Sequence, residues 1–367
     1  MHMNMPNAIL ETPLIEQHRA AGAKLAEFAG CALPDTFSDF SQEYRAAKDN
    51  VAIFDTNWHA IFRLTGRDRV RYLHAITSNN IKDLAEGHGV LALLLNPQGR
   101  ILAELEVYAL KESLLVLSHA SVREHTAATL KKYILGSQVG LEDCTDRLGT
   151  IAIEGPCAAS IVAEATGLAL TGFSELALKE LPIEAIPSRL IRRSHFGALG
   201  AQIVAPREHL GLLWTNLRNS VHAQHGLPIG MKALNALRLE AGVPWFPLDF
   251  NDSMIPHEAV LENTHISFSK GCYTGQEIVE RVRSRGHVNR KRVSLKFSTT
   301  EPPEPATKLR AAGAEVGYVT SSAFSAAANA AIGMGYLRRE HNATGSIVEF
   351  EGGTAEVSAV GTVAAGA

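Results

Sequence analysis

The feature that most restricts the fold of this chain is a succession of strands that ends in a helix. Four apolar stretches bounded by turn residues predict the strands. They are residues 60–64, 90–95, 101–109 and 114–117. A helix is expected at residues 121–133, where Ser121 and Glu124 have the spacing of a capping box. Units in which strands precede a helix predict an α+β fold rather than a doubly wound parallel sheet.

The same pattern resumes in the middle of the chain. A strand is predicted at residues 150–154, and Gly155-Pro156 opens the next helix. Apolar residues three and four positions apart predict further helices. They are residues 16–28, 67–76, 206–221 and 231–241. These segments extend the α+β pattern well beyond the first group of strands.

After Arg292 the pattern changes to short strands separated by loops rich in proline and glycine. The expected strands are residues 293–297, 316–319, 332–336 and 347–350. One loop is expected at residues 299–305, which hold three of the 15 prolines, and another at the alanine-rich stretch 323–331. This pattern predicts a small β-barrel or sandwich.

Composition and charge exclude several classes of protein. The 367 residues correspond to two or three domains, and 46% hydrophobic residues are enough for a sizeable core. The net charge of −3 does not attract nucleic acid to the whole molecule, so direct nucleic-acid binding is not expected. The chain has no apolar run long enough to span a bilayer and no secretory signal pattern, which predicts a cytoplasmic protein without a membrane partner.

The four cysteines lie far apart in the sequence and form no CxxC pair. They are Cys31, Cys144, Cys157 and Cys272. This spacing argues against a zinc ribbon or a disulfide scaffold and fits a reducing cytoplasm. No metal site is therefore expected.

The octapeptide 270–277, KGCYTGQE, contains the most informative of these cysteines. Cys272 lies between two glycines, which allow a ligand to approach the backbone, and close to Lys270 and Tyr273. A nearby cation favours the thiolate, which is the reactive form of cysteine. Two interpretations stay open on these residues alone: a turn into a helix whose cysteine is merely small, or a functional thiol.

A basic run overlaps the octapeptide. Residues 270–296 contain eight lysine and arginine residues but only two glutamates. If residues 274–283 are helical, Glu277 and Arg281 pair across one turn. The run is either a solvated helix face or a patch for a polyanion, such as a carboxylate tail or nucleic-acid phosphate.

Two shorter constellations are weaker signals. Arg238 and Glu240 lie near the end of a predicted helix, where an exposed ion pair is the ordinary interpretation. His257 and Glu258 form either a pH-sensitive pair or an ordinary surface loop. Motifs typical of zinc proteases, serine hydrolases and nucleotide-binding loops do not occur in the sequence.

Taken together, these motifs resemble the YgfZ-type folate-binding proteins, which belong with the aminomethyltransferase, or T-protein, of glycine cleavage. The resemblance runs from the region of Phe54 to the C-terminus and is most specific in the octapeptide 270–277. Further matching stretches occur in the order typical of the family. They are residues 54–58, 64–66, 96–100, 238–242, 256–258 and 316–321.

The resemblance implies three domains around a central channel that holds tetrahydrofolate or a related folate. Two interleaved ferredoxin-like α+β domains are expected within residues 1–287 and a β-barrel within residues 288–367. Cys272 is then the functional thiol in iron–sulfur cluster assembly or repair, with assembly proteins as partners, and thereby in tRNA modification. We expect a monomer. The residues expected at the cofactor are Trp58, Arg238, Glu240, Lys270, Tyr273, Gln276, Glu277 and Arg283.

The sequence departs from the aminomethyltransferases at two places. Those enzymes carry paired aspartates after the hairpin, where this chain has Ala103 and Glu104. Their pterin-binding glutamate has its counterpart here at Ala198. Loss of a charged acceptor is expected to weaken pterin binding by about 1.5–3 kcal/mol, and aminomethyl transfer from glycine is not expected.

These observations lead to three hypotheses for the function. The first is the folate-dependent accessory role in iron–sulfur maturation. The alternative is a folate-dependent aminomethyltransferase or demethylase acting on a small amine, and Ala103 counts against it. The third is a tRNA-binding module that uses the basic run, which the net charge and the scarcity of aromatic residues disfavour.

Overall fold

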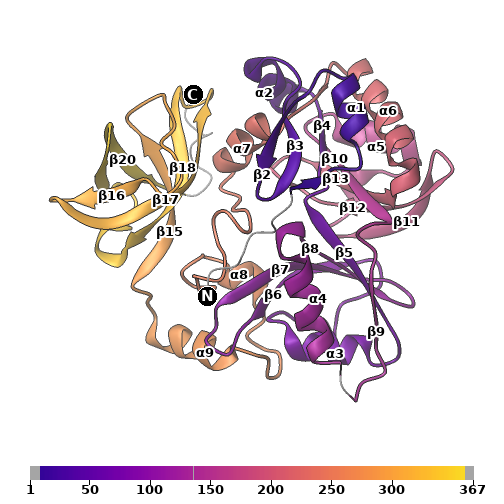
Figure 1. Ribbon diagram of the computed structural model, residues 1–367, viewed down its shortest axis with the longest axis horizontal. Helices are drawn as coiled ribbons and strands as arrows, with labels where there is room; N and C mark the ends of the chain where they lie inside the picture. The colour runs from indigo at the N-terminus through magenta and orange to yellow at the C-terminus, as the bar shows by residue number, and fades with distance from the viewer. Residues whose placement is uncertain (1–8, 135, 360–367) are drawn as a thin grey trace.

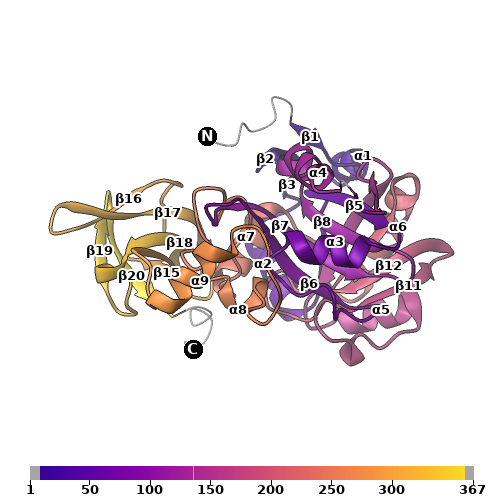
Figure 2. The same cartoon turned by 90° about the horizontal axis from the view of Figure 1, so that it is seen from below.

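The computed structural model describes residues 9–134 and 136–359, and within these residues the strands form four sheets (Figure 1). Three of the sheets pack together in the N-terminal part of the molecule. The fourth is a closed barrel that stands to one side of them (Figures 1 and 2). The described residues contain no helix with both the length and the apolar character needed to cross a bilayer.

The six-stranded sheet is assembled from segments far apart in the sequence. Its order is β11-β12-β13-β10-β4-β14, and helices α5 and α6 pack against it around the buried Trp214. The strands are β4 (Ala52–Asp55), β10 (Leu148–Glu154), β11 (Leu178–Ile183), β12 (Ile186–Arg192), β13 (Gly200–Pro206) and β14 (Leu227–Pro228). The helices are α5 (Ala158–Thr166) and α6 (Arg207–Ala223), with a 3-10 turn at Leu170–Gly172.

The five-stranded sheet is formed entirely by the chain between β4 and β10. Its order is β6-β7-β8-β5-β9. The strands are β5 (His59–Thr65), β6 (Gly89–Leu95), β7 (Ile101–Ala109), β8 (Leu114–His119) and β9 (Gly140–Asp143), and the helices are α3 (Arg69–Ile76) and α4 (Arg123–Lys132). The two sheets and their helices are thus interleaved α+β units, which confirms the expected fold class.

The predicted capping box at the start of α4 is wrong. A 3-10 turn, Ala120–Val122, precedes the helix, and α4 begins only at Arg123. The ring of His119 accepts a hydrogen bond from the backbone N–H of Ser121 at 3.1 Å. A histidine at the end of β8 therefore caps the turn in place of the expected Ser121 side chain.

The predicted helix at residues 16–28 is also wrong over its second half. Helix α1 (Ile15–Ala20) ends before Gly22, whose φ of +77° leaves the helical region, and β2 (Lys24–Phe28) follows. This strand pairs with β3 (Cys31–Thr36), which also pairs with β1 (Leu10–Glu11). Alanine-rich spacing resembled a helix, but pairing of residues 24–28 with β3 determines their conformation.

Helices α2 (Phe40–Asp49) and α7 (Met231–Glu240) connect this small sheet to the barrel. The chain then passes through α8 (Glu262–His265) and α9 (Gln276–Arg285) before it enters the barrel. Figure 1 shows α9 below the barrel, where the chain leads into β15 (Arg290–Phe297). Contact with the barrel comes from α7, which packs against β17 and β18, and from the loop after α7, where Glu258 pairs with Arg290.

The last sheet is a closed barrel in the order β15-β18-β17-β16-β19-β20, which decides between the barrel and the sandwich that the sequence pattern left open. Its strands are β15 (Arg290–Phe297), β16 (Lys308–Ala311), β17 (Ala314–Ser325), β18 (Ala330–Arg338), β19 (Ile347–Phe350) and β20 (Gly353–Ser358), with a 3-10 turn at Arg339–His341. The loop expected at residues 323–331 is shorter than predicted, because β17 and β18 extend into it and pair up to Ser325 and Ala330, and only residues 326–329 form a turn. Small alanine side chains fit the paired strands here.

Candidate functional site

A central cavity lies where the five-stranded sheet, the loop after β12 and the loop after α7 meet. Its polar walls come from β7 and β8 and from the loop after β12, and its aromatic walls include Trp58 and Trp245. The indole rings of these two residues lie 5.7 Å apart. The free volume is about 60 Å³, which is below that of typical ligand sites, so a cofactor-sized ligand requires the aromatic wall to move.

Strand β7 supplies two carboxylates to this cavity. Alternation along the strand turns Glu104 and Glu106 toward the cavity, while Ala103 is 0% exposed in the hydrophobic core. His265 contacts Glu104, with 2.8 Å between Nε2 and Oε1. Position 103 therefore faces away from the cavity. The sequence had suggested that Ala103 counts against transfer chemistry, and this argument does not hold for a residue that faces the core.

Glu106 belongs to a buried ion pair beside Glu104. Arg193 donates to Glu106 through Nε at 2.8 Å, and the Tyr108 hydroxyl donates to the other carboxylate oxygen at 2.6 Å. Burial opposes the charged form of Glu106, but the positive charge of Arg193 and the Tyr108 hydrogen bond hold its pKa at about 2. This carboxylate is therefore a permanent anion at the cavity.

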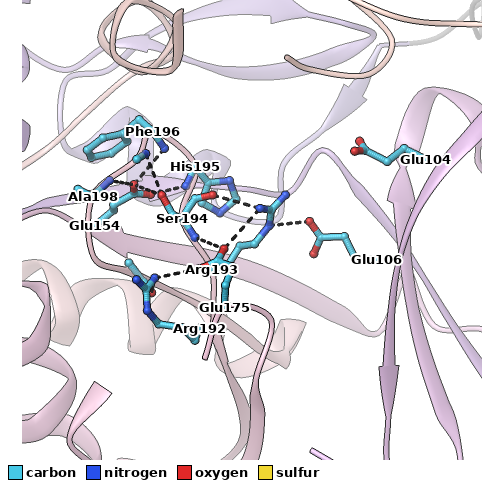
Figure 3. A network of polar contacts seen from close by, with 12 residues as sticks. Glu104, Glu106, Glu154, Glu175, Arg192, Arg193, Ser194, His195, Phe196 and Ala198 are labelled. Carbon is cyan, nitrogen blue, oxygen red and sulfur yellow. Dashed lines mark hydrogen bonds and ion pairs between the residues drawn. The ribbon is translucent and has the colours of Figure 1, made fainter. Parts of the chain in front are cut away.

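The loop that carries Arg193 and His195 wraps around a third carboxylate, Glu154, at the end of β10 (Figure 3). Glu154 Oε1 accepts hydrogen bonds from the Ser194 hydroxyl at 2.8 Å and from the backbone N–H of Phe196 and Ala198, both at 3.0 Å. Its Oε2 accepts the N–H of His195 at 2.6 Å. Burial nevertheless raises the pKa of Glu154 to about 7. Glu154 thus fixes the loop that presents Arg193 and His195.

Histidines complete the polar lining. Burial lowers the pKa of His59, and lowers those of His119 and His195 to about 3, so all three imidazoles are neutral near pH 7. His119 binds Ser121 through Nδ1, and its buried Nε2 has no hydrogen-bond partner among the described residues. An unpartnered ring nitrogen in a cavity with indole walls fits a flat heteroaromatic ligand with a hydrogen-bonding edge, such as a pterin.

Trp58 is the predicted cofactor residue that the structure places in the cavity wall. Arg238 is 0% exposed and lies one layer behind the wall, with its guanidinium 4.6 Å from the centre of the Trp245 ring. It donates to the Val243 carbonyl at 3.1 Å and forms an ion pair with Asp249. The exposed ion pair expected at this helix end is therefore wrong, because Arg238 is buried and its partner lies on the following loop.

Glu240 also lies outside the cavity lining. Its carboxylate accepts hydrogen bonds from the Tyr44 hydroxyl at 2.7 Å and the Ser325 hydroxyl at 2.6 Å, and Lys48 lies 3.4 Å away. These contacts join α2 and α7 to β17 of the barrel. Direct contact of Arg238 or Glu240 with a cofactor stays a prediction, and their observed contacts are structural.

The octapeptide presents an exposed thiol on a well-packed loop. Lys270 donates through Nζ to the backbone carbonyls of His74, Thr77 and Asn79 at the end of α3. Burial lowers the pKa of Lys270 to about 8. Tyr273 is buried in the core of the five-stranded sheet, with its ring centre 5.0 Å from Lys270 Nζ, whereas Cys272 is exposed.

Local packing also explains Gly275, Gln276 and Glu277 of the octapeptide, as well as Arg283 further along α9. Gly275 has a φ of +84°, and a Cβ there would lie 2.6 Å from the Asn96 carbonyl in the hairpin turn. Gln276 begins α9, and Glu277 pairs with Arg281 at 2.5 Å as predicted. The guanidinium of Arg283 lies 4.2 Å from the centre of the Phe268 ring.

The structure therefore separates the two groups of predicted site residues. Trp58 lines the central cavity, but no residue of the octapeptide and no residue of α9 does so. Sequence reasoning missed Glu106, Glu154 and Arg193. Glutamates at 106 and 154 within otherwise apolar strands were a detectable signal, because a strand buries a carboxylate only when donors surround it.

Comparisons with known proteins agree with this architecture. The solved aminomethyltransferase T of the glycine cleavage system from Bartonella henselae has the same fold, with a TM-score of 0.88 at 24% identity over 97% of this chain and 99% of that chain. The aminomethyltransferase of Saccharopolyspora erythraea is 28% identical over 344 residues, 93% of each chain. That of Desulfitobacterium hafniense is 26% identical over 339 residues, 92% of each chain.

Two family models match nearly the whole chain. The N-terminal domain model of the glycine cleavage T-protein matches residues 14–270, and the T-protein C-terminal barrel domain model matches residues 290–364. The second match begins at the first residue of β15. The chain belongs to the glycine cleavage T-protein family.

Proposed function

We propose that the central cavity binds tetrahydrofolate and that the protein transfers a one-carbon unit between this cofactor and a small amine. The proposal rests on the convergence of two indole walls, the unpartnered Nε2 of His119 and the carboxylate of Glu104 on one cavity. A pterin offers both an aromatic face and a hydrogen-bonding edge. The similarity to aminomethyltransferases over more than nine-tenths of their length supports the same assignment.

Each group in the cavity has a definite role in this proposal. Trp58 and Trp245 would hold the pterin ring, and His119 would bind its edge. Bound tetrahydrofolate supplies the nitrogen atoms that carry the one-carbon unit. Glu104, positioned by His265, can hold a proton on the amine or stabilise positive charge that develops there.

A tryptophan fluorescence titration of the full chain with tetrahydrofolate tests the binding. The cavity must expand around the ligand, so the environments of Trp58 and Trp245 change on binding. We expect saturable quenching in the wild-type protein and in Trp214→Phe, whose side chain is buried in the six-stranded sheet, and a smaller signal in Trp245→Phe. Absence of both quenching and heat release at millimolar ligand would refute the proposal.

Exposure of Cys272 on a loop whose neighbouring residues are well packed favours a second candidate function. In it the protein is a YgfZ-type accessory factor that supports iron–sulfur cluster assembly or repair, and thereby tRNA modification, through this thiol. The packing of Lys270 and Tyr273 holds the loop in place while the thiol remains accessible to a partner protein.

Matched variants separate the two candidates. Glu104→Gln is expected to slow formation of methylenetetrahydrofolate from an aminomethyl donor by about 10²-fold. Cys272→Ser is expected to leave that rate unchanged. If the accessory role is the function, Cys272→Ser abolishes complementation of a strain lacking the gene, while Glu104→Gln still complements.

A further inference from the structure

A second cavity lies at the junction between α9 and the barrel. Its volume is about 440 Å³, within the range of small-molecule sites, and it shares no residue with the lining of the central cavity. Its walls come from the C-terminal half of α9, the segment around α8, the start of β15 and the turn after β18.

Three cations line this junction cavity, and their charges are poorly neutralised. They are Arg283, Lys291 and Arg339. For the side chains of Lys291 and Arg339 the described part of the chain contains no ion pair or hydrogen bond, and Arg283 reaches Glu280 only at 3.5 Å. Cations from three different elements around one concave surface create a local positive potential despite the negative net charge of the molecule.

Two further side chains bring unpartnered polar atoms to the same cavity. Both ring nitrogens of His257 and Oε2 of Glu262 are shielded from solvent and have no hydrogen-bond partner within the described residues. Such atoms are costly to leave unpaired. Glu262 is also the only acid among the described residues that line the cavity. The cavity thus combines several donors for anions with one acceptor for a cationic or N–H group.

We propose that the junction cavity binds an amino dicarboxylate, a small molecule with two carboxylates and one free ammonium group. The carboxylates would pair with Arg283, Lys291 and Arg339, and the ammonium group with Glu262. A phosphate group alone leaves Glu262 without a partner and brings like charges together. This assignment is independent of folate binding in the central cavity.

Calorimetric titration of the full-length protein with L-glutamate tests the proposal. Lys291→Gln and Arg339→Gln each remove one charge from the cavity wall and are expected to weaken binding by about tenfold or more. Arg281→Gln is the matched control, because Arg281 lies on the same helix, pairs with Glu277 and does not line the cavity. It is expected to bind L-glutamate as the wild type does.

The ammonium group is tested with N-acetyl-L-glutamate, which keeps both carboxylates and lacks the charge on nitrogen. The wild type is expected to bind it about tenfold more weakly than L-glutamate, and Glu262→Gln is expected to lose this preference. Three results would overturn the proposal: no saturable binding at millimolar L-glutamate, equal weakening by Arg281→Gln, or inorganic phosphate binding as tightly as L-glutamate.

Discussion

Glu154 illustrates how one buried carboxylate can position residues of the candidate site without lining the cavity. Its two oxygens receive four hydrogen bonds from the loop that carries Arg193 and His195, and no cation is among these donors (Figure 3). Because Ala198 donates its backbone N–H to Glu154, this part of the loop is attached directly to the end of β10. The Glu154 carboxylate, which lies behind the loop, supports the conformation of the loop backbone.

The raised pKa of Glu154 predicts a pH dependence of stability. Its folded-state pKa of about 7 exceeds the ordinary value of 4.5, so the folded state binds the proton more tightly than the unfolded state. The contribution of Glu154 to the free energy of unfolding is fully present below pH 4.5 and is lost as the pH rises through 7. Its full size is on the order of 3 kcal/mol.

Urea unfolding of the wild type and Glu154→Gln at several pH values measures this contribution. The wild type is expected to lose stability relative to the variant between pH 4.5 and 7, because glutamine does not titrate. Parallel curves for the two proteins over this interval would show that Glu154 does not titrate there. Other titratable groups, such as Glu106, are present in both proteins, so their contributions cancel in the difference between the two free energies of unfolding.

At the scale of elements, Lys270 connects the octapeptide to the end of α3. A helix leaves its last carbonyls without intrahelical partners, and the ammonium group of Lys270 satisfies carbonyls at and just beyond this end. The loop that carries Cys272 therefore depends on a contact with residues almost 200 positions earlier in the sequence.

Lys270→Met tests this contact, because methionine keeps the apolar stem and removes the donors. The variant is expected to lose about 1.5–3 kcal/mol of stability in thermal or urea unfolding. Lys82→Met, an exposed lysine in the loop after α3, is the control and is expected to change stability by less than about 0.5 kcal/mol. Equal effects of the two substitutions would contradict a capping role for Lys270.

Most strands of the five-stranded sheet and of the barrel could be predicted from the sequence, whereas β11, β12 and β13 of the six-stranded sheet were missed, and the site was predicted only in part. Buried strands such as β7 and β18 are short apolar runs between turn residues, so local sequence is sufficient to find them. Residues 24–28 were mistaken for helix because their conformation depends on pairing with β3. Arg193 and Glu106 lie 87 positions apart, so their ion pair could be recognised only in the folded chain.

At the scale of the whole molecule, Asp249 joins the N-terminal part to the barrel. One carboxylate oxygen receives hydrogen bonds from the hydroxyls of Thr320 and Ser321 on β17, at 2.7 and 2.5 Å. The other binds Arg238 and the backbone N–H of Trp245. Because Trp245 also lines the central cavity, the barrel contact and the cavity wall share one buried anion.

Asp249→Asn is expected to be strongly destabilising, by about 3–5 kcal/mol, because it leaves the buried Arg238 without a counter-charge. Thr320→Val removes one donor and keeps the ion pair, so its expected cost is about 1.5–3 kcal/mol. Urea unfolding measures both changes. A cost for Asp249→Asn no larger than that of Thr320→Val would show that the ion pair contributes little to stability.

The interleaving of the two α+β units limits how this chain can be divided. Strand β4 reaches its partner β10 only after the whole five-stranded sheet has been inserted between them, which closes a long loop. Any truncation between β4 and β10 deprives the six-stranded sheet of an inner strand, whereas the barrel is one continuous segment. In fragment expression or limited proteolysis, the natural pieces are therefore the barrel and everything before it.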